Sequence, residues 1–387
     1  MNILMVVTSP EIGGTETHIL YLARELRRRG HHTGVATAGG PFVPYFDENQ
    51  IPVHRVEKLG EDHRERSAAK IASIVRSYDY DVVHVHDKDS LRLAPYLRTL
   101  CPQVGIVLTV HGKYMGSKVK HLYAATDHVI AVSPALKQWI QDAGVPAGRT
   151  SCIQNGVDTT AFAPVLHRTP YRRLLGLPRT GPLALYVGRF QSDKLPIARK
   201  CLTAGERVAR TRPNFHMLLI GFGEYGRELS RDARSANERL GRNALLVREA
   251  TVNIAPFYHA STLVIGTGRV AMEALSCARP VIAAGCAGYD GIVSERSIAT
   301  QSDHHFGDHR ARSSLHSSRI ASDVAVLLNQ RTYRKSLERA GRAVALERFS
   351  ISQTGAQTLA LYEEILAAKD KATPPLEDAR AEGEDRG

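Results

Sequence analysis

The chain has 387 residues, with 43% hydrophobic and 23% charged content, which favours a soluble globular protein of two domains. Its net charge of +12 favours anionic partners such as nucleotides without choosing among them. No apolar run reaches the length of a signal-peptide core or a membrane span, and the five cysteines show neither disulfide-framework nor zinc spacing, so we expect a cytoplasmic protein.

Short apolar runs alternate with helical stretches through the first half. Apolar residues of the predicted helix Thr15–Arg29, from Ile19 to Leu26, fall on one face. The other predicted helices are Ser67–Ser77, Leu91–Leu100 and Ala135–Gly144. The predicted strands are Ile3–Thr8, His32–Thr37, Val82–Val85, Ile106–Val110, Val129–Val132 and Ser151–Ile153. This order predicts a parallel sheet covered by helices on both faces.

The alternation stops over Val157–Pro182, which is rich in proline and reads as a linker, and then resumes. The resumed strands are predicted at Leu183–Val187, Met217–Ile220, Leu245–Val247, Leu263–Ile265 and Val281–Ala283. We therefore expect an α/β fold with two Rossmann-like, doubly wound parallel-sheet domains facing across a cleft. The expected parts are an N-terminal acceptor domain (1–168), a C-terminal donor domain (181–345), a last helix (350–369) and a disordered tail (372–387).

In the first half, two motifs follow predicted strands, where open α/β sheets bind ligands. Gly13-Gly14-Thr15-Glu16 opens a helix and would let backbone amides approach an anion, although a tight turn without a ligand explains it equally well. His111-Gly112 could aim an imidazole at the cleft, but a lone histidine there is more often a loop residue. Asn155-Gly156 is by itself a turn signal.

In the second half, Arg189 and Lys194 follow a strand and could clamp a diphosphate, the alternative being two solvated cations. Gly221 lies at the next strand exit. A glycine loop then opens a helix over Gly266–Val270, where backbone amides suit phosphate. Glu273, about one turn further on, could bind ribose hydroxyls or be a helix-face carboxylate.

Taken in order, these motifs resemble the retaining GT-B glycosyltransferases of the glycosyltransferase family 4 type. The resemblance covers Met1 to about Leu366 and adds the segments Asp127–Ser133 and Pro280-Val281-Ile282. It implies a hexosyltransferase with a nucleotide-diphosphate sugar, most readily a UDP-sugar, as co-substrate and no required cofactor or metal. The acceptor would be a glycan, a lipid-linked glycan or a small glycoside, and anomeric configuration would be retained.

The resemblance also assigns roles to single residues. Gly14 would touch the donor phosphate, His111 the donor sugar, Arg189 and Lys194 the diphosphate, and Glu273 the ribose. Backbone atoms of Arg248, Glu249 and Ala250 would read the base. Further donor contacts are expected at Gly13, Gly221, Gly266, Thr267, Gly268, Arg269 and Val270. The acceptor side would include Thr15, Glu16, His86, Lys113 and Asn155. The last helix would cross back onto the N-terminal domain.

One departure from the family pattern motivates a second hypothesis. The family carries two glutamates eight positions apart, and the first of these positions is Ile265 here. Losing a hydrogen bond from a charged group costs about 1.5–3 kcal/mol, enough to change sugar preference. Arg269 could partly substitute as a phosphate contact. The alternative function is a nucleotide-sugar-binding partner subunit with little catalysis.

Three other readings remain open. His84 and His86 share one face of a strand, so a metal hydrolase would need further ligands from Asp303–His309; polar packing is the simpler explanation. Nucleic-acid binding is disfavoured because aromatic residues make up only 6% and no basic–aromatic module occurs. Basic residues could meet an anionic membrane face or simply be solvated. They are Arg24, Arg27, Arg28, Lys113, Lys118 and Lys120.

Overall fold

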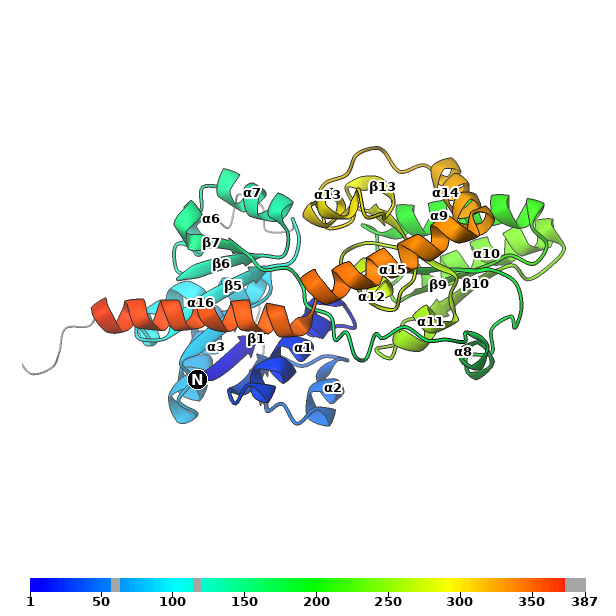
Figure 1. The fold of residues 1–387 in the computed structure, drawn as a ribbon. Helices are drawn as coiled ribbons and strands as arrows, with labels where there is room; N and C mark the ends of the chain where they lie inside the picture. Colours follow the sequence, from blue (N-terminus) through cyan, green and yellow to red (C-terminus); the bar gives the residue numbers. More distant parts are fainter. Residues whose placement is uncertain (57–62, 114–119, 373–387) are drawn as a thin grey trace, which may run out of the picture.

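The structure is a computed structural model that describes residues 1–56, 63–113 and 120–372. Its first lobe is built on a fully parallel sheet with the strand order β3-β2-β1-β4-β5-β6-β7 (Figure 1). The strands are β1 (Asn2–Val6), β2 (His32–Thr37), β3 (Val53–Arg55), β4 (Val82–Val85), β5 (Gly105–Val110), β6 (His128–Ala131) and β7 (Thr150–Cys152). The helices are α1 (Gly14–Arg28), α2 (Val43–Glu48), α3 (Arg64–Ser77), α4 (Lys88–Leu91), α5 (Ala94–Leu100), α6 (Lys120–Tyr123) and α7 (Pro134–Asp142).

The second lobe contains a sheet with the order β10-β9-β8-β11-β12-β13, parallel except for the antiparallel pair β12–β13. Its strands are β8 (Leu183–Val187), β9 (His216–Gly221), β10 (Leu245–Glu249), β11 (Leu263–Gly266), β12 (Val281–Gly285) and β13 (Gly288–Ile292). The later helices are α8 (Thr169–Leu174), α9 (Leu195–Thr211), α10 (Gly226–Leu240), α11 (Ala255–Ala260), α12 (Gly268–Ser276), α13 (Ile298–Asp303), α14 (Ser317–Asn329), α15 (Arg331–Arg348) and α16 (Ile351–Ala372).

Burial of both sheet faces explains why the strands read as continuous apolar runs. In β1, Ile3 and Met5 pack into one core while Leu4 and Val6 pack into another, and all four are fully buried. Helices cover each face, as crossover connections between parallel strands require. The predicted fold class is therefore confirmed.

Some elements differ from the sequence prediction. The predicted helix Leu91–Leu100 is two helices, α4 and α5, because Pro95 lies in the first turn of α5, where its missing N–H is tolerated. Strands β3 and β13 were not predicted. Only three residues form β3, and β13 contains two glycines, so neither carries a clear strand pattern.

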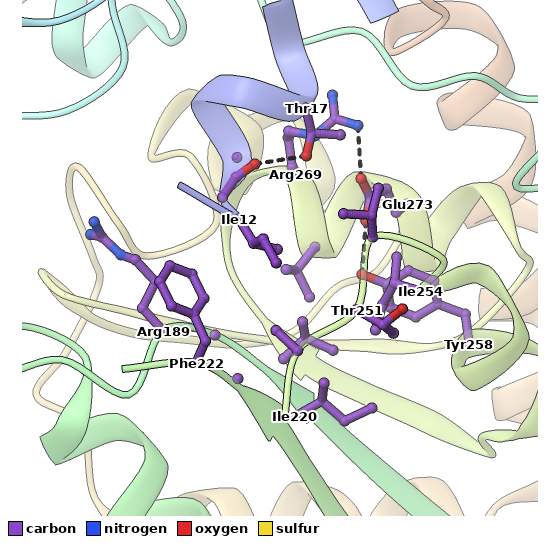
Figure 2. A pocket seen from close by; sticks show the side chains of 18 of the residues that line it. Ile12, Thr17, Arg189, Ile220, Phe222, Thr251, Ile254, Tyr258, Arg269 and Glu273 are labelled. Atoms are coloured by element: carbon purple, nitrogen blue, oxygen red, sulfur yellow. Dashed lines mark hydrogen bonds and ion pairs between the residues drawn. The ribbon is translucent and has the colours of Figure 1, made fainter. Parts of the chain in front are cut away.

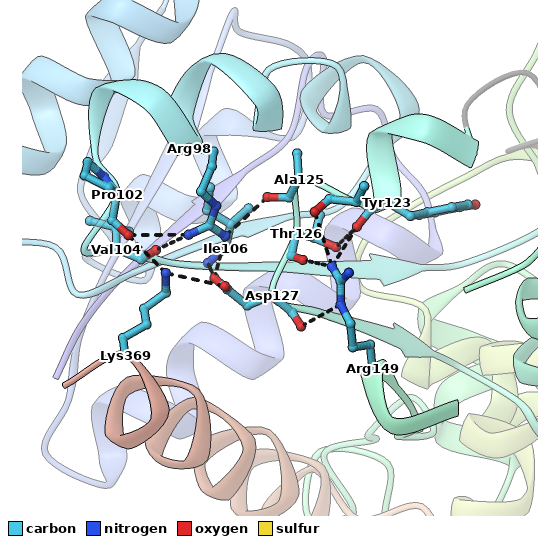
Figure 3. Close-up of polar contacts among 11 residues, drawn as sticks. Arg98, Pro102, Val104, Ile106, Tyr123, Ala125, Thr126, Asp127, Arg149 and Lys369 are labelled. Carbon is cyan, nitrogen blue, oxygen red and sulfur yellow. Dashed lines mark hydrogen bonds and ion pairs between the residues drawn. The ribbon is translucent and has the colours of Figure 1, made fainter. Parts of the chain in front are cut away.

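The last helix, α16, lies across the first lobe (Figure 1). Near its start, Arg29 of the first lobe donates a hydrogen bond to the carbonyl of Ser352 over 2.7 Å. Near its end, Lys369 Nζ lies 3.4 Å from Asp127 Oδ1, and Asp127 is also held by Arg98 at 2.7 Å (Figure 3). The helix is thus attached to the first lobe at both ends.

The membrane and tail expectations are only partly covered by the structure. In the described part of the chain, no helix is both long and apolar enough to cross a bilayer. Lys118 and residues 373–387 of the predicted tail lie outside the described residues.

Candidate active site

A crevice lies between the carboxyl ends of the two sheets. It has a large chamber of about 680 Å³ and a small chamber of about 150 Å³. The two chambers are continuous because Gly13, Gly14, Arg189, Arg269 and Val270 line both of them. These residues follow strands of both lobes, as expected for ligand sites of open α/β sheets.

The first lobe contributes the start of α1. Gly13 is the N-cap, and its carbonyl accepts hydrogen bonds from the backbone N–H (3.2 Å) and the hydroxyl (2.7 Å) of Thr17. A Cβ atom at Gly13 would come within 2.8 Å of the Glu16 carboxylate. The glycines therefore keep the helix start open at the crevice, where the first amides of a helix favour an anion.

The small chamber is organised around Glu273, which is 5% exposed. Its Oε1 accepts a hydrogen bond from Arg269 over 2.8 Å, and its Oε2 accepts one from the Tyr258 hydroxyl over 2.9 Å (Figure 2). A carboxylate has about four acceptor positions, so further lone pairs remain for a ligand. Apolar side chains form much of the remaining wall. They are Ile12, Ile220, Phe222, Val252 and Ile254.

Arg269 holds the lobes together. Its Nη1 donates to the Gly156 carbonyl over 2.6 Å, and its guanidinium carbon lies 5.2 Å from the centre of the Tyr21 ring. Only 7% of Arg269 is exposed. Gly156 and Glu273 engage two of the five guanidinium N–H groups, and Arg269 lines both chambers, so its role as a phosphate contact stays a prediction.

The glycine loop before α12 also differs from expectation. The amide of Gly268 donates to the His305 carbonyl over 3.1 Å, and the Thr267 hydroxyl donates to the same oxygen over 2.9 Å. Gly266 lines neither chamber, and a Cβ there would come within 2.4 Å of a Val270 methyl group. The Gly268 amide is therefore not free for phosphate, and Gly266 permits close packing of α12 on β11.

Two cations line the large chamber. Arg189 is about half exposed and pairs with Asp193 at 2.7 Å, and its guanidinium points away from Glu273 (Figure 2). Lys194, 8% exposed, instead forms a close ion pair with Asp308. Burial, the largest single influence, opposes ionisation of Asp308, but the Lys194 ammonium together with His309 and His305 outweighs it, so the pKa of Asp308 lies below its usual range. Asp308 also accepts a hydrogen bond from the Cys286 amide over 3.2 Å.

Histidines from separate strands meet beside the large chamber. His111 lines it, and its Nε2 lies 3.4 Å from His86 Nδ1. Burial, then the neighbouring His309, lowers the pKa of His111 to about 3, so this imidazole is neutral at pH 7. His86 is fully buried and lines neither chamber, which corrects its expected place on the acceptor side. His84 is held by Tyr362 and Thr109 at 2.6 and 2.7 Å.

Two groups have the spacing of metal ligands within the described part of the chain. The ligand atoms of His18, His86 and His111 lie within 4.8 Å of one another, as do those of His305, Asp308 and His309. Asp308 is paired with the Lys194 ammonium, which would oppose a cation in the second group. In the first group His18 and His86 are buried, and His111 is partly exposed where it lines the large chamber.

The other expected residues divide between the chambers. Thr15, Glu16, Lys113 and Asn155 line the large chamber, together with Gly14. Burial raises the pKa of the Glu16 carboxyl to about 7. Gly221 lines the small chamber.

The residues near the end of β10 that line the small chamber differ in part from those expected to contact the base. Ala250 and Thr251 line the small chamber, whereas Arg248 and Glu249 line neither chamber. Arg248 instead donates to the Leu175 carbonyl over 2.6 Å. The expected contacts at Arg248 and Glu249 are thus corrected to the loop that follows them.

Ile265 lies inside β11, paired with Tyr186 of β8 and Ile282 of β12, and is fully buried. Its strand partner Tyr186 lines the large chamber. The effect of this departure on sugar preference therefore stays a prediction. The segment that carries His305, Asp308 and His309 also lines this chamber, whereas the sequence favoured polar packing for that segment.

Comparisons with known proteins agree with this geometry. Residues 12–161 match the model of Glycosyltransferase Family 4. A phosphatidyl-myo-inositol mannosyltransferase of Mycobacterium tuberculosis is 25% identical over 93% of this chain and 95% of its own length. A D-inositol 3-phosphate glycosyltransferase of Geodermatophilus obscurus is 26% identical over 96% of this chain and 91% of its own.

A solved structure shares the whole architecture. Anabaena HepE, in complex with UDP and glucose, superimposes with a TM-score of 0.76 at 19% identity, covering 94% of this chain and all of that one. At this identity the likeness shows the GT-B fold, while the sequence relatives show the enzyme class. The resemblance drawn from the motifs is thereby confirmed: the chain is a glycosyltransferase that is similar to family 4 over residues 12–161.

Proposed function

We propose that this enzyme transfers a hexose from a nucleotide-diphosphate sugar, with a UDP-sugar favoured, to a hydroxyl of a glycan, lipid-linked or small glycoside acceptor. One observation carries the proposal. The open helix start at Gly14, the cations Arg189 and Lys194, and the carboxylate Glu273 line one continuous crevice between the lobes.

The two chambers fit the parts of such a donor. The apolar wall and Glu273 suit a nucleoside, with ribose hydroxyls on the spare carboxylate lone pairs. The diphosphate would then lie between the α1 amides and Arg189, with Lys194 close by. The sugar would extend into the large chamber towards His111 and Asp308.

Such a site would act by stabilising the leaving group and orienting the acceptor. The anomeric C–O bond breaks, the diphosphate departs with the electron pair, and the cations and helix amides neutralise its growing charge. The acceptor oxygen bonds to the same face of the anomeric carbon, so configuration is retained. Its proton passes to the leaving phosphate oxygen, and no step needs a metal ion.

The relatives guide the choice of acceptors. Those named above act on phosphatidyl-myo-inositol and inositol 3-phosphate, so inositol-bearing acceptors belong in the first panel. Arg24 and Arg28 are exposed on α1 and could meet an anionic membrane, although Arg28 is paired with Glu25 at 2.8 Å. Sedimentation with phosphatidylglycerol vesicles at low salt, compared with phosphatidylcholine vesicles, tests that contact.

The assay is release of nucleoside diphosphate from UDP-glucose, UDP-galactose, UDP-N-acetylglucosamine and GDP-mannose, with and without each acceptor. Acceptor-dependent release with one donor, and an α-linked product from an α-linked donor, is the expected result. Donor binding by calorimetry without release for any pair would instead favour the partner-subunit function. The named relatives are transferases, which disfavours that function.

A further inference from the structure

A separate cavity of about 380 Å³ lies at the other end of the second sheet. It is lined by Pro182 and Thr262, which directly precede β8 and β11, and by Arg212, which lies shortly before β9. The crevice lies at the carboxyl ends of these same strands. Five-residue strands with a rise of about 3.3 Å per residue place the two sites roughly 16 Å apart.

Positive charge dominates the walls of this cavity. Its lining includes five arginines and no acidic residue; we call Arg168, Arg172, Arg179, Arg212 and Arg334 the arginine pocket. Among the described residues, the carboxylate that pairs with arginines of this pocket is that of Glu338. It lies 3.4 Å from Arg168 and 4.0 Å from Arg334, and Lys335 also contacts it at 3.1 Å. One carboxylate shared among three cations leaves most of the charge uncompensated.

The arginines at the back of the pocket are held in place by the backbone. Arg172 is 5% exposed and donates to the carbonyls of Ala260 and Gly181 over 2.9 and 2.8 Å. Arg334 donates to the Leu327 carbonyl over 2.8 Å. A charge that is already ordered loses little further side-chain entropy when an anion binds.

A sixth arginine has unsatisfied donors among the described residues. Arg279 is 4% exposed, and its Nε and Nη2 atoms are buried without a hydrogen-bond partner among the described residues. Burial, and then repulsion from Arg168, lowers its pKa to about 10. A buried guanidinium with unsatisfied donors is costly, and a nearby anion would offset part of that cost.

We propose that the arginine pocket binds a small phosphorylated molecule. Guanidinium groups bind phosphate oxygens in pairs, and the described lining contains arginines and no lysine. A volume of about 380 Å³ falls in the range of small-molecule sites and exceeds what a single ion needs. A concave site of this size favours a soluble phosphate ester or diphosphate over a flat membrane face or a nucleic-acid strand.

The test is calorimetric titration of the full chain with inorganic pyrophosphate, in the presence of saturating UDP to occupy the crevice. Arg179→Glu is the main variant, because Arg179 is exposed and we expect its replacement to leave folding intact. Its matched control is Arg231→Glu, an exposed arginine on α10 with the same change of charge. We expect Arg179→Glu to weaken pyrophosphate binding at least tenfold and the control to change it less than about twofold.

Further variants and ligands distinguish binding in the arginine pocket from binding in the crevice, and a small phosphate from larger anions. Arg189→Ala should leave the UDP-insensitive binding of pyrophosphate unchanged, whatever it does to transfer. The double variant Arg179→Ala/Arg212→Ala should abolish that binding and keep wild-type transfer rates. Equal weakening by Arg179→Glu and Arg231→Glu would overturn the proposal. So would binding only to phosphatidic-acid vesicles or single-stranded RNA, or no binding of pyrophosphate at all.

Discussion

Replacing Arg189 by alanine tests whether the crevice stabilises a leaving diphosphate. The Arg189–Asp193 ion pair spans 2.7 Å, but the two side chains are 48% and 44% exposed. An exposed pair of this kind contributes about 0–1 kcal/mol to folding, so the variant should remain nearly as stable as the wild type. Loss of one preorganised donor to a developing charge costs about 100- to 1,000-fold in kcat, or about 2.7–4 kcal/mol of transition-state stabilisation.

The assay is the initial rate of nucleoside diphosphate release across donor concentrations, with urea unfolding of the same preparation. Arg210→Ala is the matched control, because Arg210 forms an i,i+4 pair with Glu206 at 2.7 Å on α9 and is 55% exposed. We expect Arg210→Ala to keep wild-type kcat and Arg189→Ala to lose at least 100-fold. An Arg189→Ala enzyme within about threefold of wild type would refute the diphosphate role, since the missing charge would then have no transition-state effect.

Four further outcomes are expected. Lys194→Ala should destabilise the fold by about 1.5–3 kcal/mol because the partly buried Asp308 carboxylate loses its charged hydrogen-bond donor. In urea unfolding, Lys194→Ala/Asp308→Asn should recover most of this loss. Glu273→Gln should raise the donor KM about 10- to 100-fold through a lost charged hydrogen bond, and an unchanged KM would remove the ribose contact. Burial lowers the folded-state pKa of His84 and His111 to about 3. As the pH falls, these histidines therefore take up protons in the unfolded chain at a higher pH than in the folded chain. Stability to urea should fall as pH drops from about 6.5 towards 4, and a flat profile would contradict this. EDTA should leave the rate unchanged, and loss of activity restored by added metal would point to the histidine group.

The expected loss of stability in Lys194→Ala complicates the use of this variant as a test of catalysis. An exposed clamp residue could be removed without consequence for folding, but Lys194 is 8% exposed and ion-paired across the chamber. Reduced activity in Lys194→Ala would therefore mix catalysis with stability. The double variant separates the two, because it removes both charges together.

Much of the fold was predictable because its signals are local. Buried parallel strands are apolar throughout, so β1, β4 and β8 stand out in the chain, and glycines at strand ends identified the helix starts near Gly14 and Gly268. The less apolar or very short strands, β3 and β13, gave no such signal.

Tertiary structure alone decided which site residues are free and which are already paired. Asp308 meets Lys194 across 114 positions of sequence, and Arg269 reaches Gly156 across 113, so no periodicity could indicate either contact. A motif's spacing likewise could not show that Ile265 faces the sheet core. The sequence by itself determined the alternation of elements and the family resemblance, since backbone preference and burial act over a few residues. The partners of Lys194 and Arg269 were decided by how segments distant in the sequence pack, because ion pairs and hydrogen bonds form between whichever groups the fold brings together.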